Sequence, residues 1–325
     1  MSTSQQNAPA QADHLFGIGA ATQITGIPEA TLRVWERRYH FPQALRSPGG
    51  HRQYTQQDIL QSLWVRLQLD DGMRAGQAIH ARLFTERDAA IATALHQPLA
   101  ASTPPDPALT SVQQSLLERL VADDDARASA ILREAAAQHP LQRVVLDVIG
   151  PTFTAIGDAW SAGRVAIATE HFATNFLRHQ LLAWLRASPP PFQVPPVALV
   201  CAPDELHEGS LLMLGTLLRR SHWPVRYLGQ MLPLPELGGL VDRVAPALIV
   251  FVAMSETSAL ALAGWPEWLG DRTETQVPII GYGGRAFTMD PDLAARVPGT
   301  LLGSTLEEGW RRMQRLLLHL NVLER

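Results

Sequence analysis

The feature that most constrains the fold is a change in the pattern of apolar residues after the proline-rich stretch "SPPPFQVPP" (188–196). From Val197 onward, short apolar runs of strand length alternate with segments of helical character. The runs are 197–203, 225–230, 247–254, 277–284 and 299–303, and the helical segments are 210–221, 235–244, 258–269 and 305–322. This alternation predicts a parallel, doubly wound sheet of the Rossmann-like, flavodoxin type over residues 197–325.

The middle of the chain has a different pattern. Residues 111–188 are helical in character throughout, with short connections, and predict a four-helix bundle. Segments rich in Pro, Ala and small polar residues flank it, so we predict linkers at 85–110 and 189–196. Residues 1–14 contain no charged segment followed by an apolar one and predict a disordered tail rather than a signal peptide.

Residues 15–84 predict a compact helical unit with a hairpin. "IGAATQITG" (18–26) and "PEATLRVWERRY" (28–39) form a helix, a Gly-centred turn and a second helix. "SPGGHRQY" (47–54) is a hairpin-like turn, and a Thr-capped helix follows at 55–72. This order is that of a winged helix-turn-helix, whose second helix enters the major groove while the wing contacts phosphate.

The distribution of charge supports a DNA-binding role for this unit. All 27 basic residues are Arg and the net charge is −4, but five Arg lie between Ala30 and Thr55 against the single acid Glu36. A solvated basic helix is the ordinary alternative; the complete helix–turn–helix–wing order favours DNA. We expect Trp35 and Tyr39 to pack inward. The predicted DNA-binding residues are Thr31, Arg33, Arg37, Arg38, Tyr39, His51 and Arg52.

The letters "TLR-WERRY…PGGHR-Y" at 31–54 closely resemble the MerR family of transcription regulators. The resemblance covers about residues 15–84. It implies double-stranded promoter DNA as a partner, bound by a dimer at a pseudo-palindromic element. The dimerisation coiled coil usual in that family is not apparent, so self-association has to involve another part of the chain.

Three features follow strands of the predicted sheet, where open α/β sheets bind ligands. His207 follows the first strand, Ser255 the third and the Gly283–Gly284 pair the fourth. Each alone is weak evidence, since a histidine after a strand is more often structural and a Gly-Gly pair is usually a turn. Together they predict a pocket with close backbone approach and a neutral imidazole. A ligating imidazole needs its second nitrogen held by a carboxylate, for which Glu205 is the first candidate and Asp204 the second.

The pattern acid-x-His-x-x-Gly, a later Ser and a Gly-Gly pair resembles the cobalamin-binding domain of methionine synthase and the corrinoid mutases. The resemblance covers about 195–325 and implies His207 as the lower axial ligand of cobalt. Two positions depart from the pattern: Ser210 stands where it closes on Gly, and Thr257 stands where it has Leu. By resemblance, the cofactor-binding residues here are Glu205, His207, Ser210, Ser255, Thr257, Gly283 and Gly284.

Within the predicted bundle, Trp160 stands ten residues before Glu170–His171. A core Trp and a solvated Glu–His pair are the ordinary interpretation, but the spacing is similar to that of the CarH and LitR light-dependent repressors. That resemblance implies adenosylcobalamin, with Trp160, Glu170 and His171 at its upper face. Ser161 stands where those repressors have a His that ligates cobalt after illumination, so another tetrapyrrole, a bilin or haem, is a second possibility.

The sequence therefore predicts a light-responsive transcriptional repressor, not an enzyme, that self-associates as a homodimer or homotetramer. A sensor of cobalamin or another tetrapyrrole without photochemistry is the alternative, and an empty sensory domain a further one. A corrinoid enzyme is disfavoured because no substrate-sized barrel is evident. Apolar runs too short for a bilayer predict no membrane association, and the single Cys201, expected to be a buried strand residue, fits the cytoplasm.

Overall fold

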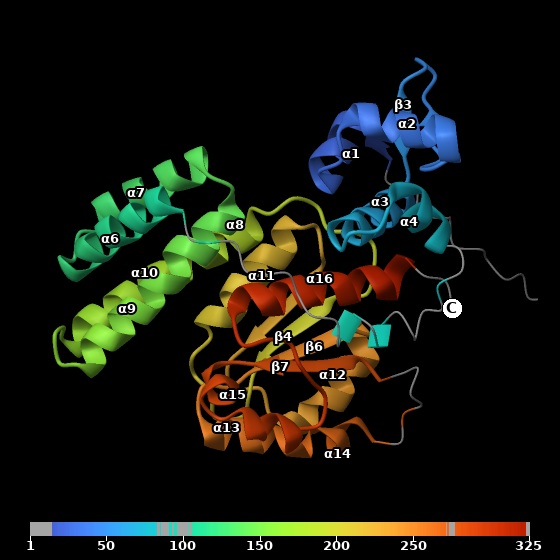
Figure 1. Ribbon diagram of the computed structural model, residues 1–325. Coiled ribbons are helices and arrows are strands. Elements are labelled where there is room, and N and C mark those ends of the chain that lie inside the picture. Colours follow the sequence, from blue (N-terminus) through green and yellow to red (C-terminus); the bar gives the residue numbers. More distant parts are fainter. Residues whose placement is uncertain are drawn as a thin grey trace, which may run out of the picture. The chain divides into compact units, whose positions relative to one another are not determined.

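The computed structural model describes residues 15–82, 85, 91–92, 94–95, 104, 106–270, 272 and 277–322 (Figure 1). They belong to two compact units, one of residues up to 93 together with 317–325, the other of residues 94–316. The predicted tail 1–14 and most of the predicted linker 85–110 lie outside the described residues.

The first unit is a helix-turn-helix with a small antiparallel sheet. Its elements are β1 (Phe16–Gly17), α1 (Ile18–Thr25), α2 (Glu29–Tyr39), β2 (Leu45–Arg46), β3 (Arg52–Tyr54), α3 (Gln56–Asp70) and α4 (Ala75–Ala81). The strands pair in the order β1-β3-β2. β2 and β3 form the wing, so the predicted helix–turn–helix–wing order is confirmed.

Local sequence signals set the limits of these helices. Helix α1 ends at Gly26, whose φ of 68° suits glycine and whose amide bonds to the Thr22 carbonyl. Helix α3 begins with a capping box in which the Thr55 side chain accepts from the Asp58 amide and the Asp58 carboxylate accepts from the Thr55 amide. A core that includes Leu32, Trp35, Ile59, Leu60 and Trp64 holds the helices together.

The second unit begins with a four-helix bundle. Its helices are α6 (Pro107–Val121), α7 (Asp125–Gln138), a continuous helix made of α8 (Leu141–Arg143), η1 (Val144–Ile149) and α9 (Gly150–Ser161), and α10 (Ile167–Arg186). The predicted linker 85–110 is wrong at its C-terminal end, where α6 starts at Pro107 because the Asp106 carboxylate caps it, accepting from the Ala108 amide at 2.9 Å. Residues 91–92 and 94–95 of that segment are also helical.

The third bundle helix contains a π-helical turn that the apolar pattern does not reveal. In η1 the Gly150 amide bonds to the Val145 carbonyl, five residues back. Pro151 follows, and a proline in an α-helix lacks a donor and collides with the carbonyl four residues earlier. The wider turn accommodates this proline, and its neighbours Val145, Val148 and Ile149 stay fully buried.

The remainder of the second unit is the predicted parallel sheet. Its strands are β4 (Val197–Cys201), β5 (Val225–Gly229), β6 (Leu248–Val252), β7 (Ile279–Gly283) and β8 (Thr300–Leu301). The helices between and after them are α11 (Gly209–Arg220), α12 (Leu237–Val244), α13 (Glu256–Ala261), α14 (Trp265–Leu269), α15 (Arg285–Met289) and α16 (Leu306–Val322), with short turns η2 (Leu234–Glu236), η3 (Leu262–Gly264) and η4 (Pro291–Ala295). The order β5-β4-β6-β7-β8 reverses direction at β4. Ligands bind such sheets beside this reversal, at the carboxyl ends of the strands.

Helices cover both faces of this sheet. Helices α12, α13, α14 and α15 pack on the face that carries Val200, Phe251 and Tyr282 (Figure 1). Helix α11 packs on the opposite face, where a Cβ added at Gly215 would lie 3.1 Å from Leu199. Because β4 and β6 are buried along their whole length, they are continuously apolar rather than alternating.

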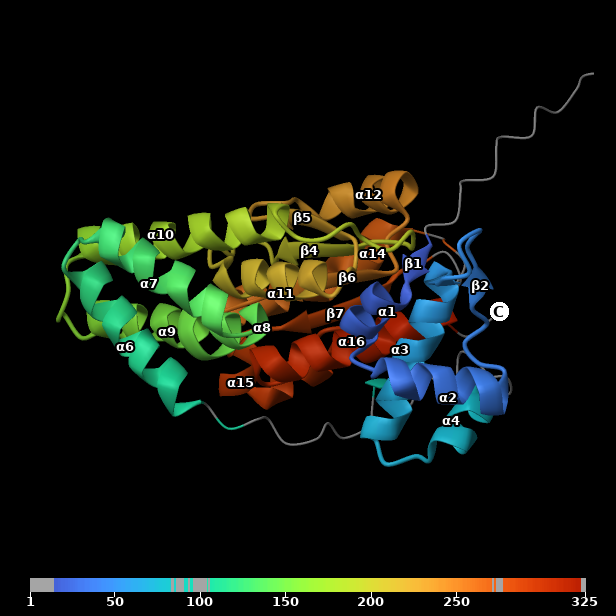
Figure 2. The same cartoon turned by 90° about the horizontal axis from the view of Figure 1, so that it is seen from above.

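The bundle joins the sheet through α11. Helix α10 lies beside α11 in both views (Figure 2), and a Cβ at Gly215 would lie 2.9 Å from Leu185 of α10. The segment 189–196 has no regular secondary structure, but it is fastened to the unit. Phe192 is 2% exposed and its amide bonds to the His222 carbonyl, so this predicted linker does not act as a free tether.

Candidate functional sites

Helix α2 presents arginines to solvent. Arg37 and Arg38 are exposed, and Arg33 is exposed but forms an ion pair with Glu29 one turn earlier. Thr31, in the first turn, is half-buried. A cationic face of this kind, on the second helix of a helix-turn-helix, is suited to contact a nucleic-acid backbone.

The two aromatic residues of α2 differ in burial. Trp35 is 5% exposed, as expected of a residue that packs inward. Tyr39 is only half-buried: it lies against α4, where a Cβ at Gly76 would be 3.3 Å from its hydroxyl, and the Arg38 guanidinium lies 5.3 Å from its ring centre. The expectation that Tyr39 packs inward is thus only half right, because its side chain lies against α4 but stays partly exposed.

The wing is fixed to α2 by an ion pair. His51 is exposed directly after the Gly49–Gly50 turn. The Arg52 Nε lies 2.7 Å from Glu36 Oε2, so the single acid of this segment is used to hold β3 against the helix. Arg52 therefore positions the wing, and His51 is exposed at its tip.

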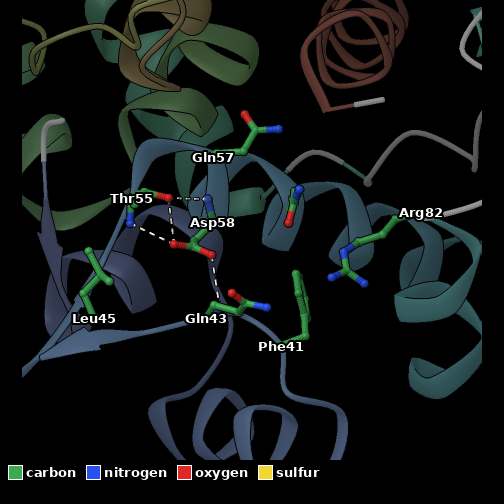
Figure 3. A pocket seen from close by; sticks show the side chains of 8 residues that line it. Phe41, Gln43, Leu45, Thr55, Gln57, Asp58 and Arg82 are labelled. Carbon is green, nitrogen blue, oxygen red and sulfur yellow. Dashed lines mark hydrogen bonds between the residues drawn. The ribbon is translucent and has the colours of Figure 1, made fainter. Parts of the chain in front are cut away.

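A hollow of about 390 Å³ lies in this unit between the 41–45 segment and the start of α3 (Figure 3). The Asp58 carboxylate accepts hydrogen bonds from the backbone amides of Thr55 and Gln43, and the Arg82 guanidinium lies 4.2 Å from the centre of the Phe41 ring. These contacts hold the 41–45 loop against α3. The hollow is lined by Phe41, Gln43, Leu45, Thr55, Gln57, Asp58, Gln61 and Arg82.

In the second unit, His207 lies in the loop between β4 and α11. Its side chain is 75% exposed, and its Nδ1 lies 2.6 Å from Oε1 of Glu205. Glu205 is itself 3% exposed and also accepts from the amides of Leu206 and His207, while its other oxygen accepts from the Met254 amide at 2.7 Å. The structure thus selects Glu205 over the exposed Asp204 as the partner of His207.

Ionised Glu205 determines how His207 presents itself. Burial alone would raise the pKa of the Glu205 carboxyl, but hydrogen bonds from the amides of His207 and Met254 and from the His207 ring hold this pKa below its usual value. A carboxylate only accepts hydrogen bonds, so Nδ1 carries the proton in the neutral imidazole. The unprotonated Nε2 is then available as a metal ligand.

The structure brings the three predicted edge features together. Met254, held by Glu205, directly precedes Ser255, whose hydroxyl caps α13 by accepting from the Ser258 amide at 3.2 Å. Thr257 is exposed in the first turn of α13. Gly284 has a φ of 117°, and a Cβ there would lie 2.2 Å from the Ala253 carbonyl oxygen. Such close approach requires glycine at 284.

The other two residues of this edge are less constrained. A Cβ at Gly283 would meet its nearest neighbour only at 3.9 Å. Ser210 lies in the first turn of α11, and its Oγ is buried with no hydrogen-bond partner among the described residues. Cys201, at the end of β4, is buried, and burial raises its thiol pKa to about 12, in line with its expected structural role.

The residues predicted in the bundle lie on α9 and α10. Trp160 is 48% exposed near the end of α9 and is followed by exposed Ser161. The Glu170 carboxylate bonds to His171 Nδ1 at 2.6 Å and accepts from the Thr174 hydroxyl at 2.7 Å. The first turn of α9 lies beside the end of the histidine loop, since a Cβ at Gly209 would lie 3.4 Å from the ring of Phe153. Trp160 lies about 10 Å beyond Phe153 along the same helix.

Three residues near His207 were not predicted from the sequence: Glu208, Arg178 and Tyr227. Glu208 is 8% exposed and is bonded by Arg178 of α10 and by the Tyr227 hydroxyl of β5. The signal available in the sequence was the second acid in "ELHEG", but nothing in the letters indicates which distant groups it meets.

Two family models match parts of the chain. Residues 16–81 match the family model described as MerR HTH family regulatory protein. Residues 112–183 match the model described as B12 binding domain. None of the helices in the described part of the chain is long and apolar enough to cross a membrane.

Two similar proteins come from Myxococcus xanthus. The HTH-type transcriptional repressor CarH is 29% identical over 252 residues, 76% of this chain and 82% of CarH. The HTH-type transcriptional repressor CarA is 28% identical over 268 residues, 78% of this chain and 85% of CarA. Among solved structures, the monomethylamine corrinoid protein of Methanosarcina barkeri covers 63% of this chain and 98% of its own, with a TM-score of 0.51 at 15% identity, a likeness of fold.

Proposed function

We propose that this chain, which joins a MerR helix-turn-helix region to a B12-binding domain and is a homologue of the repressors CarH and CarA rather than an enzyme, is a cytoplasmic repressor that senses light through adenosylcobalamin. In this proposal it binds promoter DNA as an oligomer, and the cofactor lies between the bundle and the carboxyl edge of the sheet.

The pairing of His207 with buried Glu205 carries the assignment of the cofactor. In the neutral imidazole this pairing places the proton on Nδ1, so that Nε2 of an exposed side chain can serve as a ligand at the edge of a corrinoid-type fold. The close approach at Gly284 and the buried Oγ of Ser210, which has no hydrogen-bond partner within the described part of the chain, also suit a ligand that reaches along the sheet edge. The residues of this edge therefore fit a corrinoid, whose cobalt His207 would ligate.

The upper side would be formed by the bundle. Trp160 supplies an exposed apolar ring, and Glu170 holds His171 and Thr174 in place. Bound adenosylcobalamin would supply a light-labile cobalt–carbon bond. The work of this chain's residues is to hold the adenosyl group against Trp160 and to let α9 and α10 respond when that contact is lost.

DNA affinity would be controlled through oligomerisation. Several helix-turn-helix units in one oligomer bind one operator with higher avidity and without new base contacts. A shift of two to three decades in occupancy requires a change of about 3–4 kcal/mol in the stability of the oligomer. On the DNA, Arg37, Arg38 and His51 would contact the backbone and bases, while Arg52 holds the wing.

Absorption spectra and gel filtration test this function. The full chain is incubated with adenosylcobalamin in the dark and then illuminated with green light, with His207→Ala as the variant and Asp204→Asn as the matched control. We expect coloured protein for wild type and D204N, a histidine-dependent spectrum lost in H207A, and a fall in size on illumination. A colourless wild-type protein refutes the cofactor assignment.

Ser161 favours a second candidate, a sensor of cobalamin or of another tetrapyrrole without light chemistry. In this candidate no histidine follows Trp160 to capture cobalt after illumination. Binding of cobalamin, a bilin or haem without any change of size under light would support it over the photoreceptor. A protein that binds none of these ligands would instead have an empty sensory domain.

A further inference from the structure

The residue that follows His207 is a buried carboxylate held by two other elements. One oxygen of Glu208 is bonded by Arg178 of α10, and the other accepts from the Tyr227 hydroxyl of β5. The Glu208 side chain is 9% exposed. A carboxylate so removed from water needs these partners, because an unpaired buried charge is costly.

The strand beside this loop is shaped to bring Tyr227 there. The pairing of β4 with β5 shifts register, since Leu199 is opposite Tyr227 while Val200 is opposite Gly229. Such bulges re-aim side chains next to functional sites. Gly229 has a φ of 69°, and a Cβ there would lie 3.1 Å from the Glu208 carboxylate, so the turn after β5 fits closely around Glu208.

The preceding residue is held as well. The Gln230 side-chain amide donates to the Leu206 carbonyl, so both sequence neighbours of His207 are fastened to β5 or the turn after it. A separate contact, from Glu205 to the Met254 amide, fastens the loop to the end of β6. Of these contacts, the one made by Arg178 comes from the bundle.

Helix α10 therefore links the two sides of the site. It carries Glu170 and, eight residues or about 12 Å later, Arg178. If α10 moves relative to the sheet, Arg178 leaves Glu208 as a buried carboxylate with one partner fewer. The positions of the bundle and of the histidine loop are thus energetically coupled, and such coupling is reciprocal.

We propose that Arg178 is a positioning residue which, through the Arg178–Glu208–Tyr227 cluster, couples the helical bundle to the loop that presents His207. This inference rests on the proposed function, in which His207 is the lower cobalt ligand. It deepens that function by naming the contact through which a change at the upper side of the cofactor reaches its lower ligand, and the reverse.

The test uses full-length Arg178→Met, Glu208→Gln and their double variant, with Arg186→Met as control. Arg186 is an exposed arginine on the same helix. Each protein is titrated with hydroxocobalamin and followed by absorbance. We expect each single variant to weaken binding about tenfold, as loss of outer contacts does at metal sites, and the double variant to be no weaker than either. R186M should bind like wild type.

Hydrogen exchange supplies a readout that general destabilisation does not move. In wild type, hydroxocobalamin should slow exchange of amides along both α10 and the 203–209 loop. In R178M the loop should still be protected by ligand while α10 is not, and Arg178→Lys should restore part of the response. Without ligand, exchange in the loop should be about tenfold faster in R178M than in R186M.

The outcomes separate this inference from the proposed function. If wild type binds no hydroxocobalamin, or if His207→Ala binds it as well as wild type does, the proposed cofactor role fails. The rate of hydrogen exchange in ligand-free R178M still decides whether α10 holds the loop. If wild type binds through His207 but R178M and R186M behave alike in affinity and exchange, Arg178 does not couple the bundle to the loop.

Discussion

Replacing Glu205 with Gln should loosen the histidine loop more than its conservative chemistry suggests. One carboxylate oxygen accepts from the amides of Leu206 and His207 and from the His207 ring, and the other accepts from the Met254 amide at 2.7 Å. A Gln can place its single oxygen on only one of these sides. With the Gln oxygen toward His207, its NH₂ group faces the Met254 N–H, and two donors meet. In the opposite orientation the NH₂ group faces three donors, which are the amides of Leu206 and His207 and the His207 ring N–H.

The magnitude follows from the better of these orientations. One buried backbone donor loses its acceptor, and the remaining bonds lose their charged partner. Together these changes cost about 2–3 kcal/mol in the free energy of unfolding. The loss is concentrated at the contact between the β4 and β6 loops, so the Met254 amide should exchange with solvent about 10- to 100-fold faster.

Urea denaturation followed by circular dichroism measures the first effect, and amide hydrogen exchange the second. Asp204→Asn is the control, because Asp204 is exposed and its φ of 59° is one that Asn tolerates. If E205Q is as stable as D204N and the Met254 amide keeps its protection, the buried carboxylate does not organise this loop.

Three further predictions concern other parts of the chain. Gly284→Ala should lower the free energy of unfolding by about 4 kcal/mol, since its added Cβ would meet a backbone oxygen at 2.2 Å at a φ of 117°. Gly283→Ala, the control, should change it by less than about 1 kcal/mol. Equal losses for the two variants in urea denaturation would contradict this. Arg37→Ala should weaken binding to duplex DNA and reduce the slope of log Kd against log salt concentration by about one unit. An unchanged slope would exclude a phosphate contact. Hydrogen bonds from the hydroxyl and amide of Ser304 hold the pKa of Glu308 below its usual value, so its contribution to stability is complete above the usual glutamate pKa and is lost as pH falls through the lowered one. Glu308→Gln should therefore be less sensitive to acid than wild type, and parallel stability curves from pH 6 to 3 would refute this.

The order of elements followed from local signals in the letters. Gly26, Pro28 and the Thr55–Asp58 capping box set helix limits, and continuous apolar runs set the strands. Because consecutive parallel strands place their carboxyl ends at one edge, the features at 205–207, 255 and 283–284 could be grouped from the sequence alone. The start of α6 and the π-helical turn were not foreseen, since the Pro-rich composition before Pro107 hid a helix cap and no apolar period marks the effect of Pro151.

By itself, the sequence determined a basic helix-turn-helix, a helical bundle and a doubly wound sheet, and it singled out His207 as a candidate ligand. Only the tertiary structure decided between Asp204 and Glu205, because the choice depends on which carboxylate is buried and meets the Met254 amide 49 residues away. It likewise brought Arg178 and Tyr227 to Glu208. Periodicity and caps act over a few residues and can be seen in the letters, whereas the pairing of buried charges depends on packing between elements distant in the chain.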